Sequence, residues 1–322
     1  MGDGMTPRPL RWDGRVPHPS DLEAVAELYA GYEESLLGAV DSTAADLGGY
    51  LELPDVDRGR TALLLDVERP AGFVFLSAEP YGKDVYGDIA HDGGPASVAA
   101  CADHLLSSAQ AAVDERDDDG WTLRISHWLQ DDALAAALGA RGLEPVRRFY
   151  RMRIASDSPA IPARMPELPD GVELVVRDDE QTRRAIYELD MDSFADHYNF
   201  TPTPYDAWWE HMSSGSTRDP DGWWMLTVDG EPAAFCLLDE SRAEIDEGYV
   251  GVLGVRRRFR GRGLGSLLLR RAFVRYRDMG RSATSLGVDA ENTTGAVGLY
   301  EAVGMSAVRT FQGWAMPLQP NR

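Results

Sequence analysis

The chain of 322 residues is short of several features that would place it in a special class of protein. It has two cysteines, Cys101 and Cys236, whose positions fit neither a zinc site nor a disulfide framework. It has no apolar run of about 18 residues, and its N-terminus lacks the apolar segment of a signal peptide. We therefore expect a reduced, cytoplasmic protein without a metal, and these absences exclude a membrane-spanning or disulfide-stabilised one.

Lysine is almost missing as well. Lys83 is the only lysine, so that nearly all of the 32 basic residues are arginine, and the formal net charge is −21. Nucleic acids and anionic membranes bind basic surfaces, so we expect neither as a partner. An arginine cluster inside such an acidic chain therefore indicates a local anionic target.

A proline-rich segment divides the chain. Residues 156–171, SDSPAIPARMPELPDG, carry four prolines and are typical of an inter-domain linker between residues 1–155 and 172–322. Each half begins with a short strand, one near Leu10 and one at Val172–Val176, followed by a helix and a pair of strands. Ser20 is the expected N-cap of the first helix.

The ends of the two halves match at a constant offset of 162, which follows from Gly142 and Gly304. The matching residues are Gly142, Val146, Arg147 and Phe149 in the first half, and Gly304, Val308, Arg309 and Phe311 in the second. We interpret this as a weak repeat of one α/β unit. The same offset places Arg260–Gly265 opposite Val98–Asp103, which has no glycine, and Tyr300 opposite Leu138. The first half is thus predicted to keep the fold and lose the chemistry.

The second half contains an arginine- and glycine-rich stretch, VLGVRRRFRGRGLGSLLL, between an apolar strand at Val250–Val255 and a helix at Leu264–Tyr276. Glycines let backbone N–H groups approach a ligand closely, and a helix N-terminus adds partial positive charge. The loop therefore predicts a phosphate-binding site, reinforced by Arg260 and Arg262 and extended by Arg256–Arg258. The spacing is not that of an ATP-binding or GTP-binding P-loop, and it does not fit a dinucleotide-binding fingerprint.

Two segments of this half resemble the GCN5-related N-acetyltransferase (GNAT) superfamily. GVRRRFRGRGLGSLL resembles its [QR]-x-x-G-x-[GA] signature, with Arg260, Gly263 and Gly265 at the fixed positions. SLGVDAENTTGAVGLYEAVGM resembles the following strand and helix of that family, with Met305 in place of a phenylalanine. The tandem layout is similar to mycothiol synthase-like actinobacterial acetyltransferases. The resemblance implies a mixed α/β sheet in each of two tandem GNAT-like domains, the N-terminal one degenerate, and acetyl-CoA as co-substrate.

The resemblance also implies a set of cofactor contacts. The strand before the loop would pair with the pantetheine arm of coenzyme A and supply an oxyanion N–H group, with Gly254 as the expected site of a β-bulge. Tyr300 corresponds to the tyrosine that protonates the leaving thiolate in the family. The complete set of expected cofactor-binding residues is Leu253, Gly254, Val255, Arg260, Gly261, Arg262, Gly263, Leu264, Gly265, Ser266 and Asn292. An ordinary helix cap is an equally good interpretation of Asn292.

The general base departs from the family pattern. Many relatives carry a glutamate where this chain has Tyr249, and Glu247 lies two residues earlier on the same strand face. We therefore take Glu247 as the candidate base, with a surface carboxylate as the alternative, and Tyr249 as a substrate contact. His197, in the segment after the first helix of the second half, is a second candidate substrate contact or proton relay. Acidic residues around the expected acceptor side favour a cationic amine.

The sequence therefore predicts an acyltransferase that moves an acetyl group from acetyl-CoA to a primary amine of a small molecule, within a ternary complex. The alternatives are a mycothiol synthase-like enzyme, an antibiotic-modifying or peptide acetyltransferase, and a CoA-binding regulatory protein without turnover. Two copies of one unit can pack on each other, so we expect a monomer.

Overall fold

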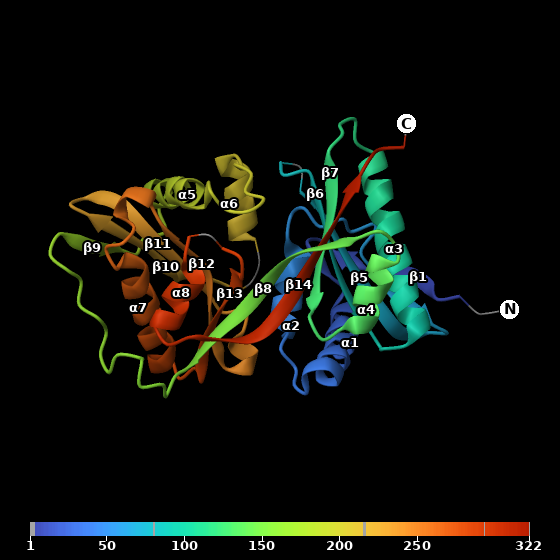
Figure 1. The fold of residues 1–322 in the computed structure, drawn as a ribbon, viewed down its shortest axis with the longest axis horizontal. Coiled ribbons are helices and arrows are strands. Elements are labelled where there is room, and N and C mark those ends of the chain that lie inside the picture. The colour runs from blue at the N-terminus through green and yellow to red at the C-terminus, as the bar shows by residue number, and fades with distance from the viewer. Residues whose placement is uncertain (1–3, 80, 215–216, 293, 322) are drawn as a thin grey trace. The chain divides into compact units, whose positions relative to one another are not determined.

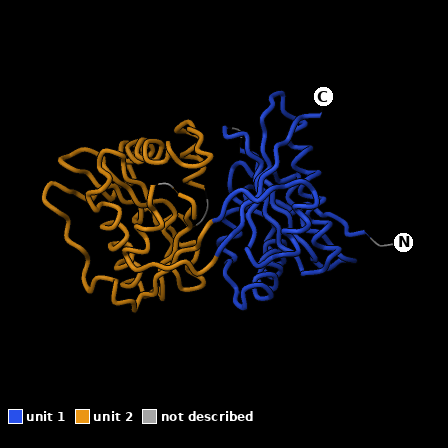
Figure 2. The backbone as a smooth tube through the Cα atoms, viewed as in Figure 1, with its two compact units in different colours: residues 1–148, 310–322 blue, residues 149–309 orange. Residues whose placement is uncertain are grey.

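The computed structural model describes residues 4–79, 81–214, 217–292 and 294–321. The chain forms two compact units, residues 1–148 with 310–322 and residues 149–309 (Figure 2). Each unit has its own mixed sheet with helices on both faces, which confirms the predicted fold class. Among the described helices, none is long and apolar enough to cross a membrane.

The first unit is built around a sheet with the strand order β1–β4–β5–β6–β7–β14, in which only the β6–β7 pair is parallel. Its elements up to β7 and the following helix are β1 (Thr6–Pro9), β2 (Trp12–Asp13), β3 (Val16–Pro17), α1 (Pro19–Leu37), α2 (Ala44–Glu52), β4 (Ala62–Asp66), β5 (Arg69–Glu79), β6 (Asp84–His91), α3 (Pro95–Asp114), β7 (Trp121–Trp128) and α4 (Asp132–Gly139) (Figure 1). The predicted N-cap Ser20 is wrong, because the cap is His18, two residues earlier, and α1 starts at Pro19 with a proline in its first turn.

Alternating positions along the strands of the first unit fill two separate cores. Leu64 and Val74 pack in the cluster of α3 and α4, while their neighbours Leu63 and Phe73 pack in the cluster of α1 and α2. Because each face of the sheet is apolar and covered, the strands are buried on both sides.

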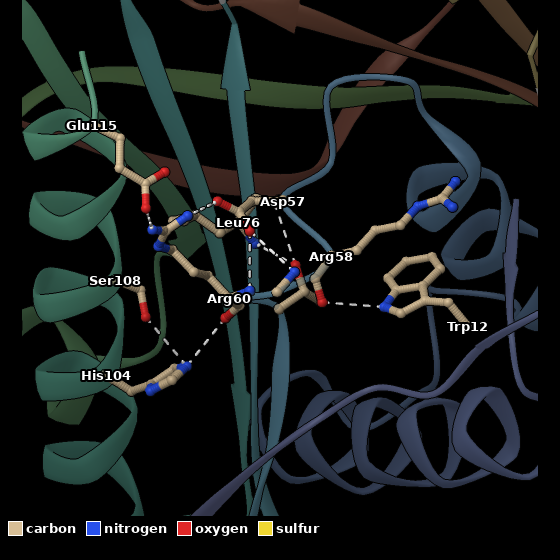
Figure 3. A network of polar contacts seen from close by, with 10 residues as sticks. Trp12, Asp57, Arg58, Arg60, Leu76, His104, Ser108 and Glu115 are labelled. Atoms are coloured by element: carbon tan, nitrogen blue, oxygen red, sulfur yellow. Dashed lines mark hydrogen bonds and ion pairs between the residues drawn. The ribbon is translucent and has the colours of Figure 1, made fainter.

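Polar side chains of the first unit fasten the segment before β4 to α3 (Figure 3). The guanidinium of Arg60 contacts the carboxylates of Asp57 at 2.6 Å and Glu115 at 2.5 Å. The Nε2 atom of His104 lies 3.1 Å from the carbonyl oxygen of Arg60, and the indole N–H of Trp12 donates to the carbonyl of Arg58 at 3.2 Å. These groups are therefore engaged in holding the unit together.

The second unit repeats this plan with the strand order β9–β10–β11–β12–β13–β8, in which only the β12–β13 pair is parallel. Its elements are β8 (Glu144–Ala155), β9 (Val172–Val175), α5 (Glu180–Phe194), α6 (Tyr205–Ser213), β10 (Arg218–Val228), β11 (Glu231–Asp239), η1 (Ala243–Ile245), β12 (Glu247–Val255), η2 (Arg257–Phe259), α7 (Leu264–Asp278), β13 (Ala283–Asp289) and α8 (Ala296–Ala302). The last strand of the chain is β14 (Ser306–Leu318).

Strand β11 illustrates how the second unit is layered. Cys236 and Leu238 pack against α7 and α8, whereas Phe235 and Leu237 pack against α5 and α6. This alternation gives the sheet two opposite covered faces, with α5 and α6 on one and α7 and α8 on the other (Figure 1).

The two units exchange their last strands. Residues Phe311–Leu318 of β14, at the end of the chain, pair with β7 of the first unit. Residues Phe149–Ala155 of β8, which follow the first unit in sequence, pair with β13 of the second. The compact units thus differ from the predicted boundaries 1–155 and 172–322, because strand pairing joins each sheet to a strand from the other half of the sequence.

The proline-rich segment 156–171 belongs to the second unit and lies along α7. Arg270 donates to the carbonyl of Ala160 at 3.1 Å, and Arg277 donates to that of Pro162 at 2.7 Å. Ile161 is buried in the cluster of α7 and α8. The segment therefore covers the helix and is part of the second unit's body.

The strand exchange predicts which fragments fold. A polypeptide of residues 149–309 contains every residue of β8 that pairs with β13, from Phe149 to Ala155. Residues 172–322 lack β8 and its buried side chains Met152 and Ile154. We expect cooperative urea unfolding, followed by far-UV circular dichroism, for 149–309 and not for 172–322. Cooperative unfolding of both fragments with the same slope would contradict the exchange.

Candidate active site

The two edges of strand β12 are paired over different stretches, which overlap at Tyr249. Its parallel pairing with β13 runs from Glu247–Ala283 to Tyr249–Ser285, while its antiparallel pairing with β11 continues to Val255. Strand β13 goes on to pair with β8 as far as Asp289. In the part of the chain that the structure describes, no strand pairs with the other edge of β12 beyond Tyr249, so the two parallel strands leave a backbone edge open.

A β-bulge marks the point where this opening begins. Leu238 pairs with Val250 and Leu237 pairs with Val252, so Gly251 is the extra residue. A bulge bends its strand and increases the local twist. The predicted bulge at Gly254 is wrong: Gly254 keeps the regular register opposite Phe235, and a Cβ atom there would lie 2.2 Å from the Phe235 ring. Packing, rather than a bulge, requires glycine at that position.

The backbone of β12 presents defined groups at the open edge. The N–H of Arg256 donates to the carbonyl of Ala233 at 2.9 Å, on the β11 side. Because successive N–H groups along a strand point to opposite edges, those of Leu253 and Val255 point to the open edge. Leu253 and Val255 are therefore the backbone donors that an extended ligand arm along this edge would meet.

The glycine loop ends β12 and starts α7. Gly261 and Gly263 have φ values of 75° and 78°, a left-handed conformation that L side chains rarely adopt, and a Cβ atom on either would meet nothing within 4 Å. Gly263 is the N-cap of α7, so Leu264, Gly265 and Ser266 carry the N–H groups of its first turn. The loop is thus an uncrowded set of backbone donors at a helix N-terminus, the arrangement that binds phosphates.

Carboxylates hold three arginines of the loop. Arg256 bonds to Asp192 at 3.0 Å, and Arg257 and Arg258 form ion pairs with Asp196 and Glu231. The guanidiniums that were predicted to extend the phosphate site are therefore directed at acidic side chains.

The remaining two arginines differ from each other. Arg260 donates to the carbonyl of Val255 at 3.1 Å and to that of Ser193 at 2.9 Å, so it ties the end of β12 to the end of α5. Arg262 is exposed, stacks over the Phe259 ring at 5.2 Å, and carries no ion pair among the described residues. Arg260 thus has the geometry of a support for the loop, and Arg262 that of an accessible cation.

Tyr300 lies in α8 and is buried beside the open edge. Burial raises the pKa of its hydroxyl well above the ordinary value, and Cys236 and Tyr249 raise it further. Cys236 is the strand partner of Leu253, and Tyr249 is the last residue paired with β13, so both neighbours flank the opening. Within the described residues the hydroxyl makes no hydrogen bond, which leaves a neutral donor without an internal acceptor.

Glu247 is held in a buried ion-pair network. Its carboxylate accepts hydrogen bonds from Arg153 at 2.5 Å, from Arg242 at 3.1 Å and from the hydroxyl of Ser285 at 3.0 Å. Burial raises the pKa of Glu247, but the hydrogen bond from Arg153 and the charges of both arginines outweigh burial and lower it overall. A carboxylate bound in this way is a poor proton acceptor. The sequence did not predict these three partners, because strand register brings Arg153 and Ser285 to Glu247, and the η1 turn brings Arg242.

His197 lies in the turn after α5, where its ring packs on Phe194 with the centroids 4.4 Å apart. Burial lowers the pKa of His197 and the charge of Arg260 lowers it further, against the opposing effects of Asp289 and Asp196. The imidazole is therefore predominantly neutral at pH 7 and can accept a proton. Asn292, by contrast, uses its side-chain oxygen to accept the N–H of Thr294 at 2.7 Å.

The first unit has the same topology around a different loop. Three residues separate the end of β6 from Pro95, where α3 begins, so the counterpart of the glycine loop is Asp92–Gly94 and the predicted counterpart Val98–Asp103 is wrong. The side chain of Asp92 accepts the N–H of Gly94 at 3.0 Å, which places a carboxylate at the helix N-terminus. Such a carboxylate repels a phosphate.

The predicted match of Tyr300 with Leu138 fits the hydrogen bonding of both units. The N–H of Met305 donates to the carbonyl of Tyr300 at 3.0 Å, and that of Leu143 donates to the carbonyl of Leu138 at 3.2 Å. The corresponding helix position in the first unit thus carries an aliphatic side chain without a proton to donate.

The architecture matches that of solved structures over the whole chain. A GCN5-related N-acetyltransferase from Sphaerobacter thermophilus superposes with a TM-score of 0.77 at 23% identity, over 97% of this chain and 98% of that one. A tandem GNAT protein from the clavulanic acid biosynthesis pathway superposes with a TM-score of 0.71 at 16% identity, over 99% of both chains. The fold is thus that of tandem GNAT proteins.

Sequence relatives identify the family. The Acetyltransferase (GNAT) family matches residues 183–305. A mycothiol acetyltransferase from Thermobispora bispora is 30% identical over 267 residues, which are 77% of this chain and 80% of the relative. A mycothiol acetyltransferase from Nocardiopsis dassonvillei is 29% identical over 297 residues, which are 84% of this chain and 74% of the relative. The chain belongs to the GNAT family of acetyltransferases and is an acyltransferase.

The glycine loop leads to a prediction about coenzyme A binding. Gly263→Ala and Gly280→Ala both place a Cβ atom at a positive φ with nothing within 4 Å, so each should cost about 1–2 kcal/mol of stability. Only Gly263 lies at the start of α7, where a methyl group would crowd a bound phosphate. We expect Gly263→Ala alone to weaken coenzyme A binding at least about tenfold by calorimetry.

Equal affinities of the two variants for coenzyme A would contradict this assignment of the loop. The same titration on the unmodified chain should give one bound coenzyme A per chain, because Asp92 occupies the corresponding helix end in the first unit.

Proposed function

We propose that the second unit transfers the acetyl group of acetyl-CoA to a primary amine of a small molecule, directly, within a ternary complex. The observation that carries this proposal is the coincidence of three features in one unit. These features are the open edge of β12, the glycine-lined N-terminus of α7, and the buried hydroxyl of Tyr300 beside them.

Coenzyme A fits these residues by its chemistry. Its pyrophosphate needs several donors and no crowding, which Gly261, Gly263 and the first turn of α7 supply, with Arg262 as an accessible cation. Its pantetheine arm carries amide groups, which match the backbone N–H groups of Leu253 and Val255. We propose these residues as the binding site, and Arg260 as the support that keeps the loop in place.

Attack of an amine on a thioester develops negative charge on the carbonyl oxygen. A backbone N–H at the open edge of β12, from Leu253 or Val255, is the proposed donor that stabilises this charge. A donor fixed in a strand does not need to reorient as the charge develops, which is why backbone groups serve well in this role.

The departing thiolate needs a proton. We propose that Tyr300 supplies it, since its raised pKa keeps the hydroxyl protonated throughout the physiological range. A phenol of high pKa is a weak acid, so the donation requires close positioning. Burial in α8 provides that positioning.

For the general base we now favour His197 over Glu247. A base must be unprotonated and available, and the lowered pKa of His197 meets the first requirement. Glu247 is also unprotonated, but its two oxygens are engaged by Arg153, Arg242 and Ser285. We therefore propose a structural role for Glu247 and proton acceptance for His197.

Tyr300→Phe tests the acid. We expect kcat to fall about 100-fold or more with little change in the KM for acetyl-CoA, because the hydroxyl acts on the leaving group. Its loss should leave the thermal midpoint unchanged, since the hydroxyl makes no hydrogen bond among the described residues.

Tyr276→Phe is the matched control. The Tyr276 hydroxyl contacts the carbonyl oxygens of Tyr249 and Asp239 at 2.8 and 2.9 Å, so this variant should lose about 1 kcal/mol of stability and keep more of its turnover. Full activity in Tyr300→Phe would refute the assignment.

The pKa of His197 predicts how kcat/KM falls on the acid side of its pH profile, the acid limb. Turnover requires the neutral imidazole, so kcat/KM should be full above the lowered pKa of His197 and fall as the pH drops through it, below 6.5. In His197→Gln we expect this limb to disappear and the rate at pH 7.5 to fall about 100-fold. Glu247→Gln should instead lower stability and retain the limb, and the opposite pattern would restore Glu247 as the base.

Three other functions remain as alternatives. Several relatives are named mycothiol acetyltransferase, so the activity of that enzyme is the second candidate. It is supported by the 30% identity to one such relative over most of both chains. An antibiotic-modifying acetyltransferase has the same site requirements. A CoA-binding regulator would bind coenzyme A without turnover. A thiol-release assay with acetyl-CoA and a panel of amines distinguishes these functions.

A further inference from the structure

We propose that the ring of Tyr249 sets the length of the acyl group that the coenzyme A site accepts, so that acetyl-CoA fits and longer acyl-CoA donors are rejected. This inference rests on the proposed transferase function and concerns the acyl donor. Three features support it: the closed end of the gap between β12 and β13, the position of the Tyr249 ring in that gap, and the direction in which coenzyme A would enter it.

The gap between β12 and β13 is filled from one face of the sheet at the point where the two strands separate. Their last pair is Tyr249 with Ser285. The next residues of the two strands, Val250 and Leu286, are buried in the cluster of α7 and α8, to which Tyr300 also belongs. Apolar side chains and one phenol therefore close this end of the gap on the face of α7 and α8.

The Tyr249 ring lies across the other face of the gap. Tyr249 pairs with Asp239, which shares a strand face with Leu237, and Leu237 packs in the cluster of α5 and α6. The hydroxyl of Tyr249 would lie 3.3 Å from a Cβ atom on Gly287. Gly287 is two residues beyond Ser285 on β13, so the ring reaches from β12 across to the neighbouring strand.

Contacts from several elements hold the ring in this position. The guanidinium of Arg151, the β8 partner of Gly287, lies over the ring at 5.5 Å from its centroid. The backbone carbonyl of Tyr249 accepts a hydrogen bond from the hydroxyl of Tyr276 at 2.8 Å. Gly287 does not have a positive φ, so the backbone does not require glycine there. The missing side chain of Gly287 instead makes room for the phenol.

The proposed phosphate site determines which end of coenzyme A meets this ring. Gly263, the N-cap of α7, follows the C-terminal end of β12, so a bound pyrophosphate would lie at the open end of the gap. The pantetheine arm would then run along Val255 and Leu253 towards Tyr249, and its far end carries the acyl thioester. Because the open edge extends only as far as Val250, the acyl group would point at the closed end of the gap.

A ring at this position limits the acyl group to a short chain. Propionyl and butyryl groups have one and two more methylenes than an acetyl group, and these would meet Tyr249 on one face and Val250 and Leu286 on the other. One extra methylene in such a pocket is disfavoured about 10- to 200-fold. Tyr249 also lies close to the proposed acid, since it is one of the groups that raise the pKa of Tyr300. The ring is therefore beside the proposed position of the reacting thioester.

The test compares acyl donors of increasing length on the full chain. We would measure kcat/KM for acetyl-, propionyl-, butyryl- and hexanoyl-CoA with one amine acceptor, and the calorimetric affinities of the same donors and of free coenzyme A without acceptor. In the unmodified chain we expect kcat/KM to fall about tenfold or more for each of the first two added methylenes.

Tyr249→Ala removes the ring. The ratio of kcat/KM for butyryl-CoA to that for acetyl-CoA should rise about 100-fold in this variant, and butyryl-CoA should bind more tightly relative to free coenzyme A. Tyr249→Phe is the matched variant, which keeps the ring and loses the hydroxyl, so its donor ratio should equal that of the unmodified chain whatever its turnover. Free coenzyme A has no acyl group to meet the ring and should bind all three proteins alike. The thermal midpoint checks that each variant folds.

Equal kcat/KM for acetyl-CoA and hexanoyl-CoA in the unmodified chain would overturn the inference while leaving the transferase intact. An unchanged donor ratio in folded Tyr249→Ala would do the same, and a lower thermal midpoint beside it would mean that the ring has a structural role only. Weak binding of the longer donors that Tyr249→Ala relieves, without turnover on any amine, would support the inference and overturn the proposed function.

Discussion

The end of the β12–β13 ladder at the Tyr249–Ser285 pair is the constraint on which the second unit depends. A sheet normally satisfies each backbone group within itself, and an unpaired edge in its middle is a cost unless something else occupies it. Gly251 bends β12 at this point, and the glycine loop and Tyr300 lie beside the opening. The cofactor binding and the proton donation that we propose thus use unpaired backbone groups that the fold itself maintains.

Most of the charged side chains at the glycine loop are paired with one another. The acidic residues that dominate the chain engage most of its loop arginines, as the contacts of Arg256, Arg257 and Arg258 show. What remains for an anion is a set of oriented backbone dipoles at the start of α7, with Arg262 nearby. Backbone dipoles fix the position of a phosphate more narrowly than flexible side chains do, and an acidic surround discourages anions that lack the matching shape.

Local patterns predicted the local structure well. The helix at Leu264–Tyr276 and the strand before it followed from periodicity, because periodicity depends on neighbours in sequence. The fold class followed from the resemblance of two segments to the GNAT superfamily. The partner Arg153 of Glu247 and the strand exchange did not follow from local patterns. They depend on the pairing of β8 with β13, which lies more than a hundred residues further along the chain. The predicted counterpart of the glycine loop in the first unit was wrong for a related reason. The offset of 162 holds at the last helix and strand of each unit, but it does not hold between β6 and α3, because the connection there is shorter.

The exchanged strands also determine the order in which the two sheets can be completed during synthesis. All residues of the second unit, 149–309, leave the ribosome before residues Thr310–Leu318, which the first sheet needs beside β7. The first unit therefore has an unpaired edge at β7 until the end of the chain is made, while the second unit can complete its sheet earlier. In this chain, the unit whose synthesis begins first is the one whose sheet is completed last.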